Sequence, residues 1–294
     1  MKKTTFLFLS AISFLSAAEF EIGKGNASLE GGFLGFNKKK SDSVKILTFK
    51  EQHQNILKSN IFYSYKISYI KSDTIQKEKQ NFNTGYSQNI PNNPFGINSQ
   101  IIPMPDINYE IEGLDAQISL GYDVLKKDNR NYLGLGIIGG ISLPWIESEK
   151  NDNNNANDFI KNGFERSKTK IKTFKIGPTL SFQKTLNRYF SIFGDFNYAY
   201  QTGKIKNNYA NFNSNINGNF YEYNIGIRFQ VKTFKKSFLG IIISPRFFIQ
   251  TGYRKSKWEF KDLDIDISGY GVYFDKSDLK MDIDQTYISL GYKF

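Results

Sequence analysis

The chain has 294 residues, no cysteine and a formal net charge of +11, with a mean hydropathy of −0.45. The lack of cysteine excludes disulfides and thiolate metal sites. Beyond the N-terminal apolar stretch, no apolar run approaches the roughly 20 residues that a membrane-spanning helix needs, which excludes a helical membrane protein. The basic balance fits an anionic membrane surface as well as plain solubility. Tyrosine, with 18 copies, gathers at bilayer interfaces.

The N-terminus has the organisation of a secretory signal peptide. A basic start at residues 1–3 precedes an apolar stretch at residues 6–15, and small residues follow up to Ala18. This arrangement is typical of an exported chain. We therefore predict a signal peptide at residues 1–18 and a single domain at residues 19–294, because no change of composition marks a boundary within the latter. An exported protein meets little nucleic acid, so no nucleic acid partner is expected.

Apolar side chains alternate with polar or small ones along most of the mature chain. A period of two is the side-chain repeat of a β-strand, so each alternating segment predicts a strand. The segments are 26–36, 44–51, 61–69, 114–124, 133–145, 174–182, 190–200, 221–231, 239–253 and 279–294. They indicate about ten strands. The alternative is eight strands from residue 56 onward, with residues 19–55 as a plug or linker.

The links between these segments are predicted to alternate in length from residue 56 onward. The short, polar links are 125–130, 185–188 and 232–236, and the long links are 72–107, 146–167, 203–218 and 256–280. A soluble sandwich has no reason for this alternation, whereas a membrane barrel has short turns at one end and long loops at the other. We therefore predict an all-β, antiparallel transmembrane β-barrel, with apolar stripes facing lipid and polar stripes facing a lumen.

The last seven residues form an amphipathic strand that ends on an aromatic side chain. Its apolar positions are Ile288, Leu290, Tyr292 and Phe294. This run resembles the C-terminal insertion signal of bacterial outer membrane β-barrel proteins. The resemblance implies localisation in the outer membrane, contact with its lipid and lipopolysaccharide, and insertion by the barrel assembly machinery. It also implies that the short turns are periplasmic and the long loops extracellular.

The last hairpin carries a change of parity. Leu279, Met281 and Ile283 are odd-numbered, whereas the apolar residues after 287 are even-numbered. We predict a β-bulge at residues 284–286 that reconciles the two stripes. The hairpin is predicted to turn near residues 269–271.

Three motifs that might carry chemistry have structural explanations. Gly134–Gly139 matches G-x-G-x-x-G but lies inside a strand segment, with no helix after it. The Asp262–Asp266 run lacks the glycine and the final glutamate of an EF-hand calcium loop. His53, the single histidine, falls in a predicted periplasmic turn, whereas outer membrane barrel enzymes resemble one another in using a histidine at the outer side. We therefore predict a non-enzyme without cofactor or metal.

Charges of both signs occupy predicted lumen positions. The candidate network comprises Asp115, Asp195, Arg228, Arg246 and Arg254, with Glu112, Asp123 and Glu222 at further lumen positions. Such a network is either structural, because buried charges must pair, or the lining of a narrow pore. A barrel of about ten strands lies near the size that side chains fill, which favours a structural network.

These observations predict a surface protein with a structural or binding role. Exposed loops such as 72–107 are where binding usually occurs, so a host or small-molecule ligand is expected there. A narrow small-solute channel is the alternative, and a barrel hydrolase is the third possibility.

Overall fold

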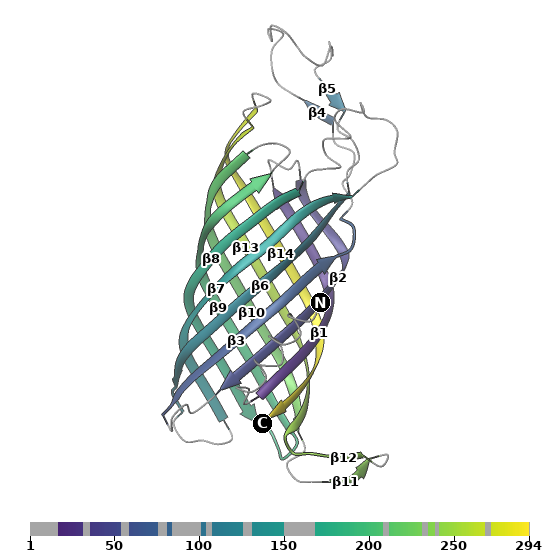
Figure 1. Ribbon diagram of the computed structural model, residues 1–294, viewed down its shortest axis with the longest axis vertical. Coiled ribbons are helices and arrows are strands. Elements are labelled where there is room, and N and C mark those ends of the chain that lie inside the picture. Colours follow the sequence, from purple (N-terminus) through teal and green to yellow (C-terminus); the bar gives the residue numbers. More distant parts are fainter. Residues whose placement is uncertain are drawn as a thin grey trace, which may run out of the picture.

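The computed structural model is a closed antiparallel barrel (Figure 1). It describes residues 17–31, 36–53, 59–75, 81–83, 101–103, 108–125, 131–149, 168–207, 212–230, 235–238, 241–267 and 272–293. The strand order around the barrel is β1-β14-β13-β10-β9-β8-β7-β6-β3-β2, so the first and last strands pair. The prediction of ten strands, rather than eight with a plug, is confirmed. Within the described ranges, no helix has the length and apolar character needed to cross a membrane.

The barrel strands are long. They are β1 (Ala17–Gly31), β2 (Phe36–His53), β3 (Ile61–Ser72), β6 (Asn108–Asp123), β7 (Asn131–Glu149), β8 (Lys168–Thr185), β9 (Phe190–Asn207), β10 (Phe212–Gln230), β13 (Phe247–Ile267) and β14 (Val272–Lys293). Two small sheets lie at opposite ends of the barrel in Figure 1. One pairs β4 (Asn81–Asn83) with β5 (Ile101–Pro103), and the other pairs β11 (Lys235–Phe238) with β12 (Ile241–Ile243). Following the rule for such barrels, we call the β4–β5 end extracellular and the β11–β12 end periplasmic.

A belt of exposed apolar side chains surrounds the periplasmic part of the barrel. Its members include Phe20, Ile22, Ile67, Ile118, Leu120, Ile137, Ile176, Ile225, Ile227 and Ile288. On β9 the belt runs from Phe190 to Tyr200, which at about 3.3 Å per residue is a length of about 33 Å along the strand. With a strand tilt of about 40°, this length gives the band of about 25 Å that lipid requires. The apolar stripes therefore face hydrocarbon, as predicted.

Beyond the belt, towards the extracellular end, the alternation is reversed. On β14, Leu279, Met281 and Ile283 are buried inside the barrel, whereas Ile288 and Leu290 face outward. The β13–β14 register is continuous from the Phe247–Tyr292 pair to the Phe260–Leu279 pair. The predicted bulge at residues 284–286 is therefore wrong. The apolar residues change from even to odd numbers because the outer face of the wall meets water there, so the apolar side chains lie on the inner face.

Several predicted links are wrong in length, because the strands continue beyond the lipid belt. Residues 203–218 are mostly strand, since β9 and β10 are joined by residues 208–211. Residues 268–271 join β13 and β14, so the predicted turn of the last hairpin is confirmed. The link predicted at 232–236 is longer, at residues 231–246, and contains β11 and β12. The strict alternation of short and long links is consequently not observed.

The part of the barrel beyond the belt, which we call the projecting part, encloses an apolar core. The largest fully buried side chains there include Leu29, Ile75, Ile111, Ile146, Ile205, Ile216, Phe220, Phe260 and Leu263, with Trp258 close behind. These side chains come from strands all around the barrel. The extracellular half of the interior is consequently packed like the core of a soluble protein.

Candidate functional site

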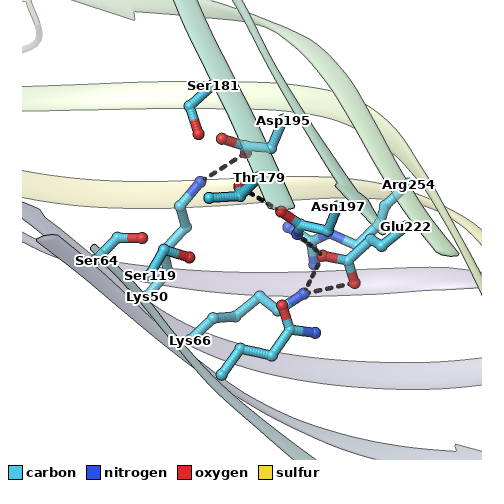
Figure 2. Close-up of a pocket in the computed structure, with 11 residues that line it drawn as sticks. Lys50, Ser64, Lys66, Ser119, Thr179, Ser181, Asp195, Asn197, Glu222 and Arg254 are labelled. Atoms are coloured by element: carbon cyan, nitrogen blue, oxygen red, sulfur yellow. Dashed lines mark hydrogen bonds and ion pairs between the residues drawn. The ribbon is translucent and has the colours of Figure 1, made fainter. Parts of the chain in front are cut away.

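A layer of buried charges crosses the barrel interior below the apolar core, and Figure 2 shows the part of it that lines a pocket. We call it the charged layer, and it consists of Glu21, Lys50, Lys66, Asp115, Lys175, Asp195, Glu222 and Arg254. These residues occupy inward-facing positions of strands that otherwise present apolar side chains to lipid. Lys175, for example, lies between the exposed Phe174 and Ile176. Because side chains alternate between the two faces of a strand, each charged residue between two lipid-facing residues points into the lumen.

Two of the ion pairs join strands that are not neighbours in the barrel. Arg254 donates from both terminal nitrogens to Glu21, at 2.5 and 2.8 Å, which is the bidentate geometry that guanidinium and carboxylate favour. Lys66 bonds Glu222 from across the lumen. Ser256 Oγ donates a further bond to Glu222 at 2.9 Å. Each carboxylate is therefore neutralised, as burial away from water requires.

A third pair joins the charged layer to the apolar core. Lys175 Nζ lies 2.5 Å from Asp115, which also accepts hydrogen bonds from Ser142 and Gln117, each at 2.6 Å. The same ammonium lies 3.6 Å from the centre of the Phe220 ring, a cation–π contact. Trp258 Nε1 donates to Ser142 at 3.1 Å. The floor of the apolar core is thereby hydrogen-bonded to the charges beneath it.

The fourth pair lies nearer the periplasmic end. Lys50 Nζ is 3.0 Å from Asp195, and Asn224 donates to the same carboxylate at 3.0 Å. Tyr287 in turn donates to Asn224 at 2.7 Å. Four lysine or arginine side chains are thus each paired with a different carboxylate, so the formal charges of the layer balance.

The space left within the charged layer is small. Its cavity has a volume of about 30 Å³ and is lined by polar side chains, among them Lys50, Lys66, Asp195, Glu222 and Arg254 (Figure 2). This volume suits a water molecule or two and nothing larger. Among the residues that the structure describes, no group of three or more histidine, aspartate or glutamate side chains is placed to hold a metal ion.

An aromatic collar closes the periplasmic side of the charged layer. It consists of Phe62, Tyr132, Phe193, Phe248 and Tyr287, all buried. These rings fill the space that inward-facing glycines leave on the same strand or on a neighbouring one. A Cβ on Gly291 would lie 2.0 Å from Phe248, and one on Gly134 would lie 2.1 Å from the Tyr132 hydroxyl. The G-x-G-x-x-G run therefore lies within β7 and receives side chains, not a phosphate.

The predicted charge network is partly brought together. The structure places Asp115, Asp195 and Arg254 in the charged layer. Arg228 lies in the collar, where it donates to Gln183 at 2.8 Å and its guanidinium carbon is 4.5 Å from the centre of the Phe248 ring. Arg246 is exposed in the turn before β13, so its assignment to the lumen is wrong. The prediction treated residues 239–253 as one strand, although they contain β12 and the start of β13, and Arg246 lies in the turn between these two.

Other predicted positions also have to be reassigned or lie outside the described part. Glu112 faces outward and accepts a hydrogen bond from Tyr69, so it does not line the lumen. Ile288, Leu290 and Tyr292 face lipid, and Phe294 lies outside the described residues, as do residues 1–16. The insertion signal and the cleavage after Ala18 remain predictions.

The sequence reasoning missed half of the charged layer. Lys66 and Lys175 were available from the same parity rule, because both lie between apolar residues of clearly alternating segments. Glu21 was missed because β1 begins at Ala17 and not at residue 26. Lys50 belongs to a segment with weak alternation.

His53 ends β2 at the periplasmic end, as predicted, but it is not an exposed turn residue. Its side chain is 13% exposed, bonds Glu51 and stacks on Tyr63 with ring centres 4.2 Å apart. This cluster lies at the opposite end of the barrel from β4 and β5.

No family model and no curated relative matches the chain. The outer membrane protease OmpT from Escherichia coli has a similar fold, with a TM-score of 0.51 and 11% identity over 95% of this chain and 96% of that chain. The translocator domain of the autotransporter NalP from Neisseria meningitidis matches with a TM-score of 0.39 and 10% identity over 100% and 95%. Ail from Yersinia pestis matches with a TM-score of 0.27 and 10% identity over 94% and 99%.

At such low identity the likeness to OmpT concerns the fold alone. The lipid-facing belt is independent support for a membrane location, because a soluble protein does not expose a continuous apolar band of this height. The chain thus has the fold of a bacterial outer membrane β-barrel protein, and its exposed apolar belt supports a location in the outer membrane.

Proposed function

We propose that the protein is a closed outer membrane barrel with a structural or binding role at its extracellular end, and that it is neither a solute channel nor an enzyme. The observation that carries this proposal is the filled interior. Three successive layers, the apolar core, the charged layer and the aromatic collar, occupy the lumen. The cavity within the charged layer, at about 30 Å³, suits a water molecule or two, which supports a lumen without a path for solutes.

The charges also favour a structural role over a pore lining. Each cation of the charged layer is held by a carboxylate within 3.0 Å or closer, so a passing ion would have to break a buried pair. Breaking such a pair by removing one partner costs about 3–5 kcal/mol. Conduction would further require the apolar core above to open.

Planar bilayer recordings test the channel alternative. We expect the protein, purified from outer membranes, to be silent. Phe220→Ala and Trp258→Ala, combined with Phe62→Ala and Phe248→Ala, empty the floor of the apolar core and open the aromatic collar. This variant should produce discrete conductance steps, which the remaining charged layer keeps small. Phe174→Ala combined with Phe196→Ala removes two lipid-facing rings and serves as the matched control, with silence expected. Steps of uniform size in the unsubstituted protein would refute the proposal.

The absence of catalysis is tested separately. His53, the single histidine, lies at the periplasmic end, whereas a surface hydrolase needs its general base beside the extracellular substrate. Casein and a fluorescent phospholipid should therefore be left intact by cells that display the protein. Turnover that exceeds that of vector-only cells, and that survives His53→Ala, would identify a carboxylate-based hydrolase instead.

A binding role is expected for the extracellular end. The link between β3 and β6 contains the β4–β5 hairpin, which stands away from the barrel in Figure 1. Replacing residues 81–103 by a short Gly/Ser linker should leave the barrel folded, because among the described residues β4 and β5 pair only with each other. We expect that this variant keeps its heat-dependent gel mobility. Loss of the folded band would mean that the hairpin is part of the barrel's own stability.

A further inference from the structure

Four lysines form a like-charged patch on the outer wall of the barrel. Lys170 and Lys172 lie on β8, and Lys204 and Lys206 lie opposite them on β9. The register sets Lys170 against Lys206 and Lys172 against Lys204, and all four side chains are exposed. Directly opposed side chains have Cβ atoms about 5 Å apart, and like charges in such positions destabilise a sheet. We call these residues the lysine quartet.

The described neighbours of the lysine quartet form no ion pair with it. The next strand, β10, presents Asn213 beside Lys206 and Asn215 beside Lys204. On the other side, Glu147 of β7 is engaged by Lys168 at 3.1 Å. Within the described residues no ion pair joins the quartet to a carboxylate.

The β13–β14 wall, which β10 separates from β9, shows how the same barrel neutralises lysines elsewhere. Between β13 and β14 the register opposes Lys255 to Asp284, Lys257 to Asp282 and Lys280 to Glu259. Lys257 also bonds Glu259, and Lys280 lies 3.3 Å from Glu30 of β1. The barrel therefore pairs lysines with complementary charges elsewhere on its outer face, whereas the described part of the β8–β9 wall does not.

The height of the lysine quartet identifies the kind of partner. On β8 the quartet is followed towards the periplasm by the lipid-facing Phe174 and Ile176, and on β9 by Thr202 and then Tyr200. Lys172 Nζ lies 5.5 Å from the centre of the Phe174 ring. The lysines thus stand immediately outside the hydrocarbon, where the phosphates of the outer-leaflet lipid lie.

We infer that the lysine quartet binds the phosphate groups of lipopolysaccharide, with its acyl chains against the belt below. The phosphates supply the anions that the wall lacks, and the amides of Asn213 and Asn215 face the sugar hydroxyls. This interaction surface does not depend on whether the lumen conducts, so it goes beyond the proposed function.

Binding of purified lipid A to the detergent-solubilised protein tests the inference. The quartet variant changes Lys170, Lys172, Lys204 and Lys206 to Gln. The matched control changes Lys255, Lys257, Lys261 and Lys280 to Gln, which removes the same charge from the β13–β14 wall. Folding of both is checked by heat-dependent gel mobility. If the quartet variant does not fold, the double variant Lys172→Gln and Lys204→Gln replaces it.

We expect the quartet variant to bind bis-phosphorylated lipid A at least tenfold more weakly, and the control to stay within threefold of the unsubstituted protein. Without lipid A the quartet variant should melt at a higher temperature, since the repulsion is relieved. Equal weakening in both variants would overturn the inference, because net charge would then explain binding. Undiminished binding of dephosphorylated lipid A would also overturn the inference. So would displacement of bis-phosphorylated lipid A by equimolar inorganic phosphate, because free phosphate would then be the ligand.

Discussion

The membrane-embedded and projecting parts of the barrel have opposite side-chain arrangements on one continuous wall. On β14, Ile288 and Leu290 face out while Gln285 and Ser289 face in; further up, Met281 and Ile283 face in while Asp282 faces out. The hydrogen-bonded ladder does not change between the two parts. The difference shows that the medium outside the wall decides which face of a strand is apolar. The outer face is apolar where it meets lipid, and the inner face is apolar where the outer face meets water.

The largest effect is expected where the embedded part contains buried charge. Glu21→Ala leaves Arg254 without its bidentate partner and should lower the free energy of unfolding by about 3–5 kcal/mol. Glu30→Ala breaks the exposed pair with Lys280 higher on the same strand and should cost less than about 1 kcal/mol. Guanidinium titration in lipid vesicles measures both. Similar costs for the two variants would mean that the lumen is wet.

A pair of isoleucines on β14 tests the reversal of parity directly. Ile283→Ala empties space in the apolar core and should cost about 2–5 kcal/mol. Ile288→Ala, five residues further along, changes a side chain that is 63% exposed to lipid and should cost less than about 1.5 kcal/mol. The same titration applies. The larger cost at Ile288 would place the core on the wrong side of the wall.

A charge on the outer face distinguishes lipid from water. Ile225→Arg puts a guanidinium near the middle of the belt and should cost about 2–4 kcal/mol. Asn217→Arg, on the same face of β10 but above the belt, should lie within about 0.5 kcal/mol of the unsubstituted protein. If both changes are neutral, the belt is not in contact with hydrocarbon.

The smallest effect on stability is expected for a spectroscopic variant. Trp145→Phe leaves Trp258, which is 2% exposed inside the projecting part, as the single tryptophan. Its fluorescence should resist both aqueous acrylamide and brominated lipid, because a protein wall separates it from each. Strong quenching by either reagent would show that the apolar core is open on that side.

The sequence predicts the barrel and the direction of its belt, because Leu120, Ile137 and Ile227 lie in clear period-two stripes and prove to be exposed. It does not predict which face of a stripe meets lipid at a given height. Leu279 and Trp258 follow the same alternation as the belt residues, yet they point inward. Deciding between the two requires the level of the membrane, which follows from the assembled barrel and not from any single strand.

The candidate charge network shows a similar limit. The parity of Asp115 and Arg254 is sufficient to place them in the lumen, whereas their partners Lys175 and Glu21 come from other strands. The two members of these pairs lie 60 and 233 residues apart in the sequence. Local patterns define which way a side chain points, and only closure of the barrel defines what it meets.

Pairing of β1 with β14 has a consequence for biogenesis. Residues 17–31 form an antiparallel ladder with residues 279–293, so this seam joins the first and the last strand of the barrel. Before the last strand arrives, both seam edges carry unpaired amides and carbonyls, which hydrocarbon does not tolerate. Contacts of such high order form slowly. A nascent copy therefore has to be held as an unsealed sheet until its C-terminal strand is delivered, and a truncation of that strand should be degraded, not inserted.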